Sequence, residues 1–593
     1  MVNSPDLFPA ARHVLAFDAT TRFDVAVTPS TDPSLPGQGY ELIVGAGKSY
    51  LRFADDAGRR YGEQAIGQLA APDGTLPRVH LRDWPDLATR GFMLDVSRDR
   101  VPTRATLDRL VDVLSTCRYN QLQLYIEHTF AYRDHATVWE GASPITPEDL
   151  RWLDDRCRLA GIELVANQNC FGHMAPWLRH DRYRSRAECP DGFEAGPGLR
   201  LPPSTLEPTA ANAEFVLALV REQLTTLQGR QVNIGCDETF ELGRGASRGR
   251  VEQHGAAAIY AEHVHRIADP LVADGCGVQF WGDVAAHHPQ SLDLLPREGT
   301  TALVWNYEAP DAPSLDLSDE WTQVLIGLGI DFNAGTHFAR RVAPFAEAGT
   351  RFWVAPGTSS WSSLVGRIDN AVANLRDAVE AASASGAEGV LVTDWGDGGH
   401  HQPPAVSYPA IAYGGAVSWC LATNEDVDLR AAVNRRIVHD DADLIGGVLT
   451  DIGGVAERTG MVARNCSPLF AALFPHQFAA TSGTPDLDAL RDVIATLDSS
   501  LSELGRARPA IAEGSPVEDL SVAIELARFG AVTLAGRAGE ALAHPARRHA
   551  HLSELIGRYR ASWLTTSRPG GLERSVGHLE RTRRRLEGEA QDA

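Results

Sequence analysis

The sequence predicts an α/β protein: a (β/α)8 barrel of the TIM type with a small N-terminal α+β domain and a helical C-terminal region. Eight short apolar runs recur between residues 91 and 397, and segments with helical periodicity separate most of them. Alternating strands and helices imply parallel strand pairing, and eight such units over about 330 residues match one barrel with insertions. After residue 425 the remaining sequence is helical in pattern.

Residues 1–85 predict the small α+β domain. Two runs typical of β-strands, YELIVG at 40–45 and SYLRFAD at 49–55, precede a segment around residues 60–70 with helical spacing.

Residues 86–424 predict the barrel. Its eight expected strands lie at 91–98, 120–126, 162–169, 231–238, 276–283, 300–308, 351–357 and 389–397. Clear helical patterns lie at 103–117, 147–160, 208–227 and 367–386. The second of these helices has a defined start, because Thr146 is a good N-cap and Pro147 suits the first turn.

Residues 425–593 predict the helical region. The stretch DALRDVIATLDSSLSELGRA, at 488–507, has apolar residues at helical spacing. Such helices pack on the barrel or form a subunit contact, so a homodimer through this region is one expectation.

Composition and charge limit the partners and the location. The 593 residues are 44% hydrophobic and 22% charged, with a net charge of −22. This charge argues against nucleic acid and anionic membranes as partners. No run approaches about 18 apolar residues, and residues 1–20 lack the pattern of a signal peptide. The eight cysteines form no CxxC pair, so a cytoplasmic protein with reduced thiols is expected.

Polar and aromatic residues follow the predicted strands. In a barrel of this type the carboxyl ends of the strands converge on the active site. The residues at these ends are Asp95, Arg98, Glu127, His128, Asn167, Asn169, His173, Asp237, Glu238, Trp281, Asp283, Trp305, Tyr307, Trp361, Asp394, Trp395 and Asp397.

The residue types at these ends favour a sugar as the ligand. Tryptophan rings cover the apolar faces of a sugar, while carboxylates and amides bind its hydroxyls. The sequence has no HxH at the first strand, no HExxH, no GxSxG and no phosphate-binding loop. His400 and His401 form a pair of metal-ligand types without an obvious third histidine. Neither a metal nor a cofactor is therefore expected.

Three strands together resemble the catalytic barrel of glycoside hydrolase family 20, the β-N-acetylhexosaminidases. The matching stretches are TRGFMLDVSRDRVPTRATLDRLVDVLSTCRYNQLQLYI from residue 89, IELVANQNCFGHM from residue 162 and NIGCDE from residue 233. The resemblance extends over roughly residues 85–420, and the small N-terminal domain also fits it.

The resemblance implies a role for each matching residue. Glu238 would be the general acid/base, Asp237 would hold the 2-acetamido group of the substrate, and His173 would lie near the acid/base. Arg90 would bind ring hydroxyls. The remaining candidates for substrate binding are Glu127, His128, Asn169, Trp281, Trp305, Tyr307, Trp361, Asp394, Trp395 and Asp397.

The sequence departs from the family at two places. Glu127, His128 and Thr129 replace the usual Asp-Asp after the second strand. After the seventh strand, Trp361 stands in place of a tyrosine that contacts the acetamido oxygen, and Ser363 in place of an aspartate. Tyr307 could supply the missing hydroxyl. These departures leave open N-acetylglucosamine or N-acetylgalactosamine as substrate, and a divergent branch or a sister family as the origin.

The adjacent acids Asp237 and Glu238 suit a substrate-assisted mechanism. Family 20 is an exception to the rule of two separated carboxylates, because the acetamido oxygen of the substrate attacks the anomeric carbon. One acid then protonates the leaving oxygen and the other orients the amide. Repulsion between the two is expected to favour a protonated Glu238 beside an ionised Asp237.

Two alternatives remain open from the sequence. The first is a two-carboxylate retaining β-glycosidase, with Glu238 as the acid and Asp283 or Asp394 as the nucleophile. The second is a non-catalytic sugar-binding protein on the same scaffold.

Overall fold

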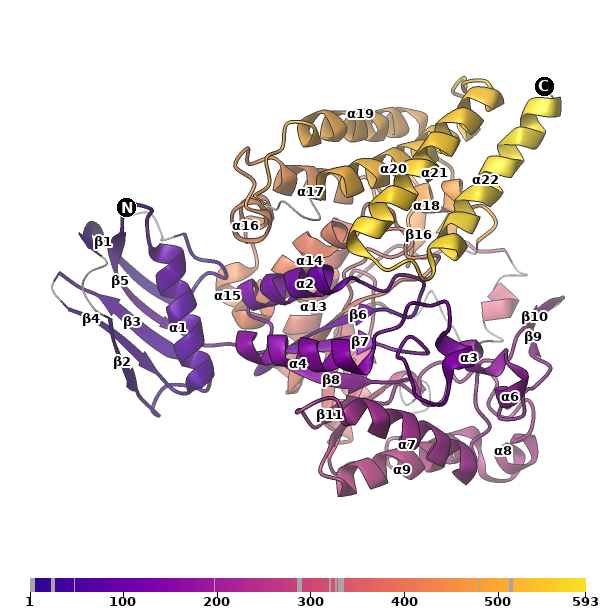
Figure 1. The fold of residues 1–593 in the computed structure, drawn as a ribbon, viewed down its shortest axis with the longest axis horizontal. Coiled ribbons are helices and arrows are strands. Elements are labelled where there is room, and N and C mark those ends of the chain that lie inside the picture. Colours follow the sequence, from indigo (N-terminus) through magenta and orange to yellow (C-terminus); the bar gives the residue numbers. More distant parts are fainter. Residues whose placement is uncertain are drawn as a thin grey trace.

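The computed structural model describes residues 6–22, 27–46, 48–196, 198–284, 291–318, 322–325, 328, 335–477, 479–510 and 516–592. Three parts follow one another along the chain, as Figure 1 shows: a small sheet domain, a barrel and a group of long helices. The predicted fold class is thereby confirmed.

The N-terminal domain is a five-stranded sheet covered by one helix. The strand order is β1-β5-β3-β4-β2. Asp55 caps the helix by accepting the Gly58 N–H, and Tyr61, Ala65 and Ile66 lie on its buried face. The elements are β1 (His13–Arg22), β2 (Val27–Thr31), β3 (Tyr40–Val44), β4 (Ser49–Phe53), α1 (Asp56–Leu69) and β5 (Thr75–Asp83).

Eight parallel strands close into the barrel, in the order β11-β12-β13-β14-β15-β6-β7-β8. Every predicted strand run overlaps one of them. The strands are β6 (Thr89–Asp95), β7 (Gln121–Tyr125), β8 (Glu163–Asn167), β11 (Gln231–Asn233), β12 (Gly277–Trp281), β13 (Thr300–Trp305), β14 (Phe352–Ala355) and β15 (Gly389–Asp394). The strands are shorter than the predicted runs, because the polar residues that end each run belong to loops.

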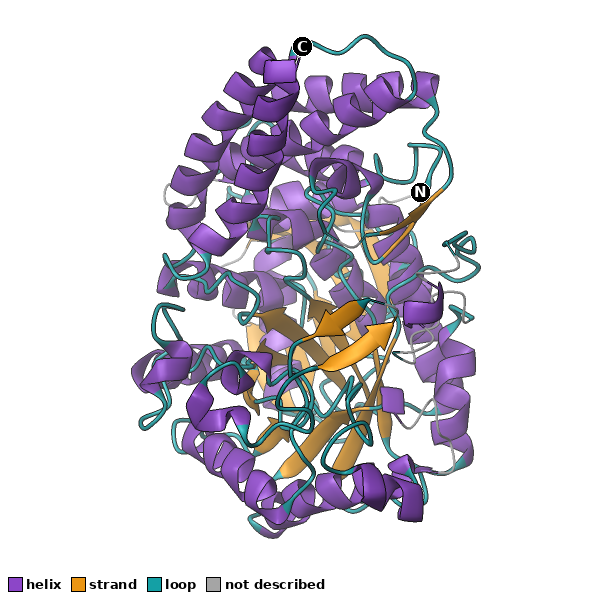
Figure 2. Ribbon diagram, turned by 90° about the vertical axis from the view of Figure 1, so that its right-hand side faces the viewer, coloured by secondary structure: helices purple, strands orange, loops and turns teal. Residues whose placement is uncertain are grey.

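Helices surround the barrel (Figure 2). They include α2 (Arg104–Thr116), α4 (Pro147–Ala160), α7 (Ala210–Leu224), α9 (Ala256–Ala273), α12 (Phe338–Glu347), α13 (Ile368–Ser385) and α14 (Tyr408–Trp419). The predicted start of α4 is confirmed: Thr146 accepts the Asp149 N–H, the Asp149 side chain accepts the Thr146 N–H, and Pro147 occupies the first turn. Short elements in the loops include α3 (Ala136–Trp139), α5 (Ala175–Leu178), α6 (Asp181–Arg184), β9 (Phe193–Gly196), β10 (Leu199–Leu201) and α8 (Arg248–His254).

The C-terminal region is mainly helical and packs against the barrel. Arg568 donates to Asp149 at the start of α4 at 2.9 Å, and the Thr103 N–H donates to the Thr566 carbonyl at 3.0 Å. The longest elements are α17 (Ile445–Gly453), α19 (Leu487–Leu504), α20 (Pro516–Arg537), α21 (Pro545–Thr566) and α22 (Leu572–Asp592). The prediction that strands stop after residue 425 is wrong in one detail, since β16 (Val462–Arg464) pairs with β17 (Ala480–Ser482).

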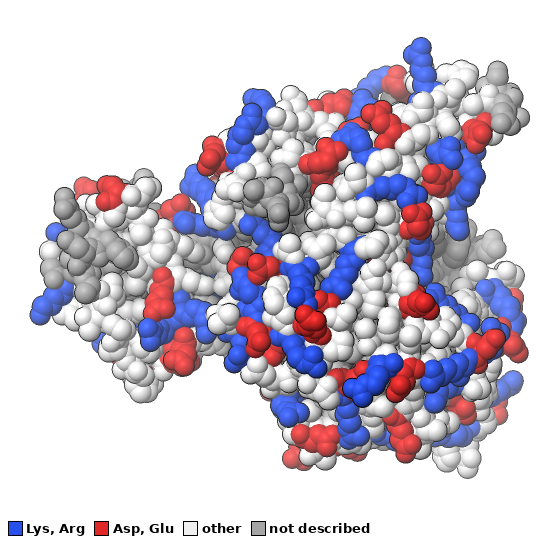
Figure 3. Space-filling model, in the orientation of Figure 1, with Lys and Arg blue, Asp and Glu red and all other residues white. Residues whose placement is uncertain are grey.

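Charged side chains of both signs are interspersed over the face in Figure 3. That face therefore presents no continuous basic surface of the kind that nucleic acids bind. Within the described ranges, no helix has the length and apolarity needed to cross a membrane.

Candidate active site

The two predicted catalytic acids lie in a tight turn after β11. Cys236 and Glu238 have left-handed backbone conformations, with φ of 69° and 47°, which residues other than glycine rarely adopt. Such conformations persist where the surrounding structure holds them, and they cluster at functional sites. We call residues 234–238 the acid turn.

Neighbouring side chains hold the acid turn in place. The Asn169 Oδ1 accepts the Cys236 N–H at 3.2 Å, and its Nδ2 donates to Asp237 Oδ1 at 2.9 Å. Tyr260, on α9, donates its hydroxyl to the Cys236 carbonyl at 3.0 Å. Gly172 passes so close that a Cβ there would lie 2.1 Å from the Asp237 carbonyl oxygen. The structure therefore brings Asn169 together with the acids.

His173 bridges the two acids. Its Nε2 lies 3.1 Å from Asp237 Oδ2 and 3.3 Å from Glu238 Oε2. Burial alone would lower the pKa of His173, but Asp237 and Glu238 hold this pKa well above its ordinary value. Burial alone would likewise raise the pKa of Asp237, but the charge of His173 and the hydrogen bonds from His173 and Asn169 bring it below its ordinary value. An ionised Asp237 beside an imidazolium follows.

Asp283, which follows β12, contacts the backbone of the acid turn. Its Oδ2 accepts the Glu238 N–H at 3.1 Å. Burial, and then the Asp237 carboxylate, raise the pKa of Asp283 to about 7. The carboxyl next to Asp237 whose pKa is strongly raised is therefore that of Asp283. Asp283 follows the neighbouring strand, so its closeness to Asp237 is not visible in the sequence.

Arg98 gathers three carboxylates beside the acid turn. Its guanidinium nitrogens lie 2.8 Å from Asp95, 3.1 Å from Asp397 and 3.6 Å from Glu127. The guanidinium carbon lies 5.0 Å from the centroid of Trp395, close enough for a cation–π contact. Glu127 also reaches His173, at 3.8 Å. The predicted residues Glu127 and Asp397 thus belong to one cluster with the acids.

Aromatic rings form a wall at the same end of the barrel. Tyr307 stacks on Trp305 with centroids 5.2 Å apart and meets the edge of Trp361 at 5.1 Å. Trp395 lies 5.9 Å from Trp281. Four of these five rings are buried, and the fifth, Trp305, is partly buried. We call these five residues the aromatic wall, and all five are predicted site residues.

The prediction that Arg90 lies in the site is wrong. Arg90 is the second residue of β6, and the five residues to Asp95 span about 16 Å of strand, so Arg90 lies at the opposite end of the barrel. Its guanidinium is fully buried and donates to the carbonyls of Leu87 and Arg118 at 2.7 and 2.8 Å, and to the Tyr61 hydroxyl at 2.8 Å. It joins the barrel to the N-terminal domain.

We expect Arg90→Met to destabilise the protein without changing the site. The change leaves several buried acceptors without a donor, each costing about 1–3 kcal/mol. Urea unfolding should therefore show a free energy of unfolding lower by several kcal/mol, whereas the folded fraction should keep the affinity of the wild type for the sugar that the sequence predicts as ligand. Arg98→Met is the matched control, expected to weaken sugar binding. Loss of sugar binding in a stable Arg90→Met protein would contradict this assignment.

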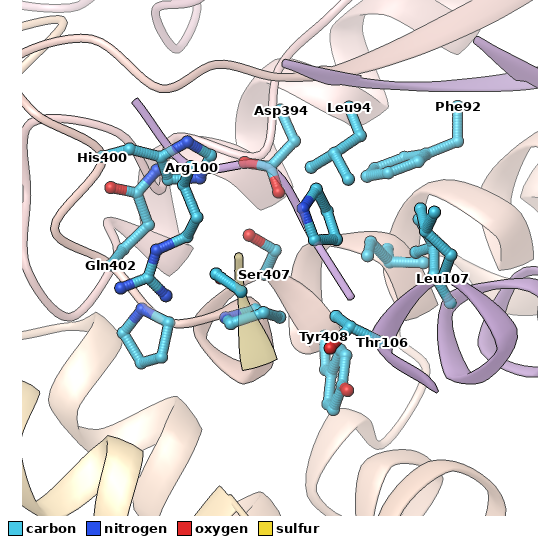
Figure 4. A pocket seen from close by; sticks show the side chains of 16 residues that line it. Phe92, Leu94, Arg100, Thr106, Leu107, Asp394, His400, Gln402, Ser407 and Tyr408 are labelled. Atoms are coloured by element: carbon cyan, nitrogen blue, oxygen red, sulfur yellow. The ribbon is translucent and has the colours of Figure 1, made fainter. Parts of the chain in front are cut away.

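Asp394 also lies outside the site, contrary to prediction. It points away from the barrel axis into a cavity of about 40 Å³ between the barrel wall, α2 and α14 (Figure 4). Leu94 and Tyr408 line the same cavity. Thr358 donates its hydroxyl to Asp394 at 2.7 Å, and burial raises the pKa of Asp394 to about 6. Because side chains alternate along a strand, Asp394 and its neighbour Trp395 face opposite sides.

The three candidate histidines after strands β7 and β15 also lie away from the acids. His128 lines a separate cavity of about 310 Å³, together with Arg179 and Arg574. His400 lines the cavity of Asp394, and His401 stacks on Phe474 at 4.4 Å. Within the described ranges, no three His, Cys, Asp or Glu side chains are grouped closely enough to hold a metal ion.

The closed parallel barrel places the acids and the aromatic wall at the carboxyl ends of its strands, where the active sites of such barrels lie. No family model matches the chain. Beta-hexosaminidase subunit alpha of Bos taurus is 28% identical over 170 residues, which are 26% of this chain and 32% of that protein. Hexosaminidase D of Homo sapiens is 23% identical over 219 residues, which are 35% of this chain and 43% of that protein. The chain thus spans less than half the length of these curated relatives.

Solved structures share the fold over more of the chain. A chitobiase of Flavobacterium johnsoniae superposes with a TM-score of 0.54 at 13% identity, covering 97% of this chain and 98% of that one. An exo-β-N-acetylglucosaminidase of family 20 from Vibrio harveyi gives a TM-score of 0.53 at 13% identity, covering 70% and 74%. These comparisons confirm the resemblance to glycoside hydrolase family 20 that the sequence motifs indicate.

Proposed function

We propose that the protein is an exo-acting, retaining β-N-acetylhexosaminidase that releases terminal β-linked N-acetylglucosamine or N-acetylgalactosamine by substrate-assisted catalysis. The observation that carries this proposal is the group of Asp237, His173 and Glu238 beside the aromatic wall. A proton-holding histidine within hydrogen-bond reach of an anion and of a second carboxyl suits acid–base chemistry on a sugar bound against tryptophans.

The first step would form an oxazolinium ion. The acetamido oxygen attacks the anomeric carbon, and the glycosidic bond breaks as Glu238 gives its proton to the leaving oxygen. Asp237 accepts the acetamido N–H and balances the positive charge that develops on the ring. In the second step Glu238 takes a proton from water as the water oxygen attacks the anomeric carbon. The bond between this carbon and the acetamido oxygen breaks, its electron pair restores the acetamido group, and the sugar leaves with its β configuration retained. His173 fixes the relative positions of the two acids throughout.

The hydroxyls of the sugar would bind at Arg98. Its guanidinium already lies between Glu127 and Asp397, so a ring placed there meets both donors and acceptors. Arg98 thus takes the role that the sequence resemblance implied for Arg90.

The geometry disfavours the two-carboxylate alternative. Asp394 faces a different cavity. Asp283 directs one oxygen at the Glu238 backbone, and the other is buried. A nucleophile must reach the anomeric carbon to within about 3–3.5 Å, and neither carboxyl is placed for this.

A panel of four aryl β-glycosides tests the proposal: glucoside, galactoside and the two N-acetylhexosaminides. Hydrolysis of at least one N-acetylhexosaminide without hydrolysis of the matching hydroxy sugar is expected, since the acetamido group supplies the nucleophile. No turnover of any of the four would favour the non-catalytic sugar-binding alternative. The same panel reveals the preferred epimer.

We expect Trp395→Ala to weaken the binding of N-acetylhexosamine by a few kcal/mol, given the aromatic area removed. Trp395 contacts both Trp281 and the ring of Tyr125, 4.7 Å away, so its loss opens the wall. Calorimetric titration with the sugar measures the effect. An unchanged affinity would place Trp395 in the scaffold alone.

Cysteine chemistry supports a reducing compartment such as the cytoplasm. All eight cysteines are unpaired and buried, and disulfides are rare where thiols are kept reduced. A homodimer through the C-terminal helices stays a prediction.

A further inference from the structure

Asp283 has the features of a residue that holds the acid turn. Glu238 adopts φ of 47°, and an L-residue in this region needs support from its surroundings. Asp283 supplies such support by accepting the Glu238 N–H through Oδ2 at 3.1 Å. Its strand, β12, pairs with β11 in parallel, and the Trp281 N–H donates to the Gly235 carbonyl at 2.9 Å. The acid turn and Asp283 are therefore fixed to the same part of the barrel.

The second oxygen of Asp283, Oδ1, has no hydrogen-bond partner among the residues that the structure describes. This Oδ1 atom is also buried. Among the described residues, the charged groups that act most on the pKa of Asp283 are the two carboxylates of the acid turn, first Asp237 and then Glu238. The other titratable groups around it are the thiol of Cys236 and the phenol of Tyr260, whose pKa values the Asp283 charge helps to raise.

An ionised carboxylate is unfavourable at this position. A negative charge without a cation is costly when buried, and a neighbouring negative charge increases the cost. A neutral carboxylic acid avoids this cost and still accepts a hydrogen bond through one oxygen. Below its pKa of about 7, Asp283 thus accepts the backbone N–H of Glu238 while adding no charge next to Asp237.

We propose that Asp283 is a positioning residue for catalysis, which holds the left-handed backbone of Glu238 and thereby aims the Glu238 carboxyl at the leaving oxygen. This inference rests on the proposed function, because it gives Asp283 a purpose only if Glu238 transfers a proton. It gives a reason for a third acid, with one buried oxygen, beside the two others.

Two substitutions separate positioning from simple loss of structure. Asp283→Asn keeps an acceptor for the Glu238 N–H and is neutral at every pH, so kcat should stay near that of the wild type. Asp283→Ala removes the acceptor, and kcat should fall on the order of 10- to 100-fold, with KM nearly unchanged, as for other small misplacements of a catalytic group. The loss should be larger for an alkyl glycoside than for an aryl glycoside with an acidic phenol, since only the former needs strong acid assistance.

Asp394→Ala is the matched control. It removes another aspartate near the carboxyl end of a barrel strand, but one that is buried and faces a different cavity. Its kcat should match that of the wild type on both glycosides. Equal kcat for Asp283→Ala and the wild type, or equal losses in Asp283→Asn and Asp283→Ala, would overturn the proposal.

Thermal melting tests the neutral state without any assay of activity. An acid whose pKa is higher in the folded than in the unfolded protein reduces stability as pH rises between the two values, because the unfolded chain releases its proton first. With the folded pKa of Asp283 at about 7, Asp283→Asn should melt above the wild type at about pH 8, and the difference should shrink toward about pH 4. A difference independent of pH would overturn the neutral state. An inactive wild type would refute the proposed function, while the melting curves would still report on Asp283.

Discussion

Glu238→Gln is expected to fold normally and to lose about 10²–10⁴-fold in kcat on glycosides with poor leaving groups, the usual value of general acid catalysis. The Glu238 carboxyl lies 3.3 Å from His173, and its backbone N–H is bound by Asp283. Glutamine preserves these contacts in shape but has no proton to give. Steady-state kinetics on an alkyl N-acetylhexosaminide measures the loss.

The leaving group provides the control for Glu238. An aryl glycoside with an acidic phenol departs without a proton, so the first step should suffer much less in Glu238→Gln. Small and equal losses on both glycosides would remove Glu238 from the acid role. Circular dichroism and the melting temperature, compared with the wild type, would exclude a folding defect as the cause.

Asp237→Asn is expected to lose on the order of 10²–10³-fold in kcat, as when other electrostatic groups of an active site are removed. Asp237 accepts hydrogen bonds from both Asn169 and His173, at 2.9 and 3.1 Å. An asparagine has only one acceptor oxygen, so one of these donors would face an NH₂ group. The variant also loses the anion that balances the oxazolinium ion, and with it much of its affinity for a thiazoline analogue of that ion.

A 2-fluoro glycoside distinguishes the role of Asp237 from that of an enzyme nucleophile. Such sugars trap carboxylate nucleophiles as stable esters, whereas a substrate-assisted enzyme forms no ester. The mass of the wild-type protein should therefore stay unchanged after incubation. A stable adduct on Asp283 or Asp394, found by peptide mass spectrometry, would replace this account by the two-carboxylate mechanism.

The sequence predicts the barrel well because its strands are buried on both faces. A strand such as β15, in which every residue is buried, reads as a continuous apolar run between helical segments. The N-terminal sheet was predicted less fully. Its edge strand β2 is mostly exposed, so its sequence carries little hydrophobic signal, and neither β1 nor β5 was predicted.

The site was predicted where a residue follows its strand closely and faces the barrel axis. Asp237 and Glu238 follow β11 closely, and both lie within reach of His173. Arg90 lies at the start of β6 and Arg98 follows its end at Asp95. The sequence does not show where this strand ends, so it does not show which of the two arginines lies near the acids. Asp394 and Trp395 lie on opposite sides of their strand. Because every residue of β15 is buried, the sequence pattern does not reveal which side faces the barrel axis.

The measurement that tests substrate assistance most directly is the inhibition constant of an N-acetylhexosamine thiazoline with the wild-type protein, relative to that of the free sugar. The thiazoline has the bicyclic shape of the oxazolinium ion, and analogues of high-energy species bind about 10²–10⁸-fold more tightly than ground-state ligands. Our account predicts competitive inhibition at least about 100-fold tighter than by the sugar of the preferred epimer. A thiazoline that binds no better than the sugar, in a protein that hydrolyses N-acetylhexosaminides, would contradict it.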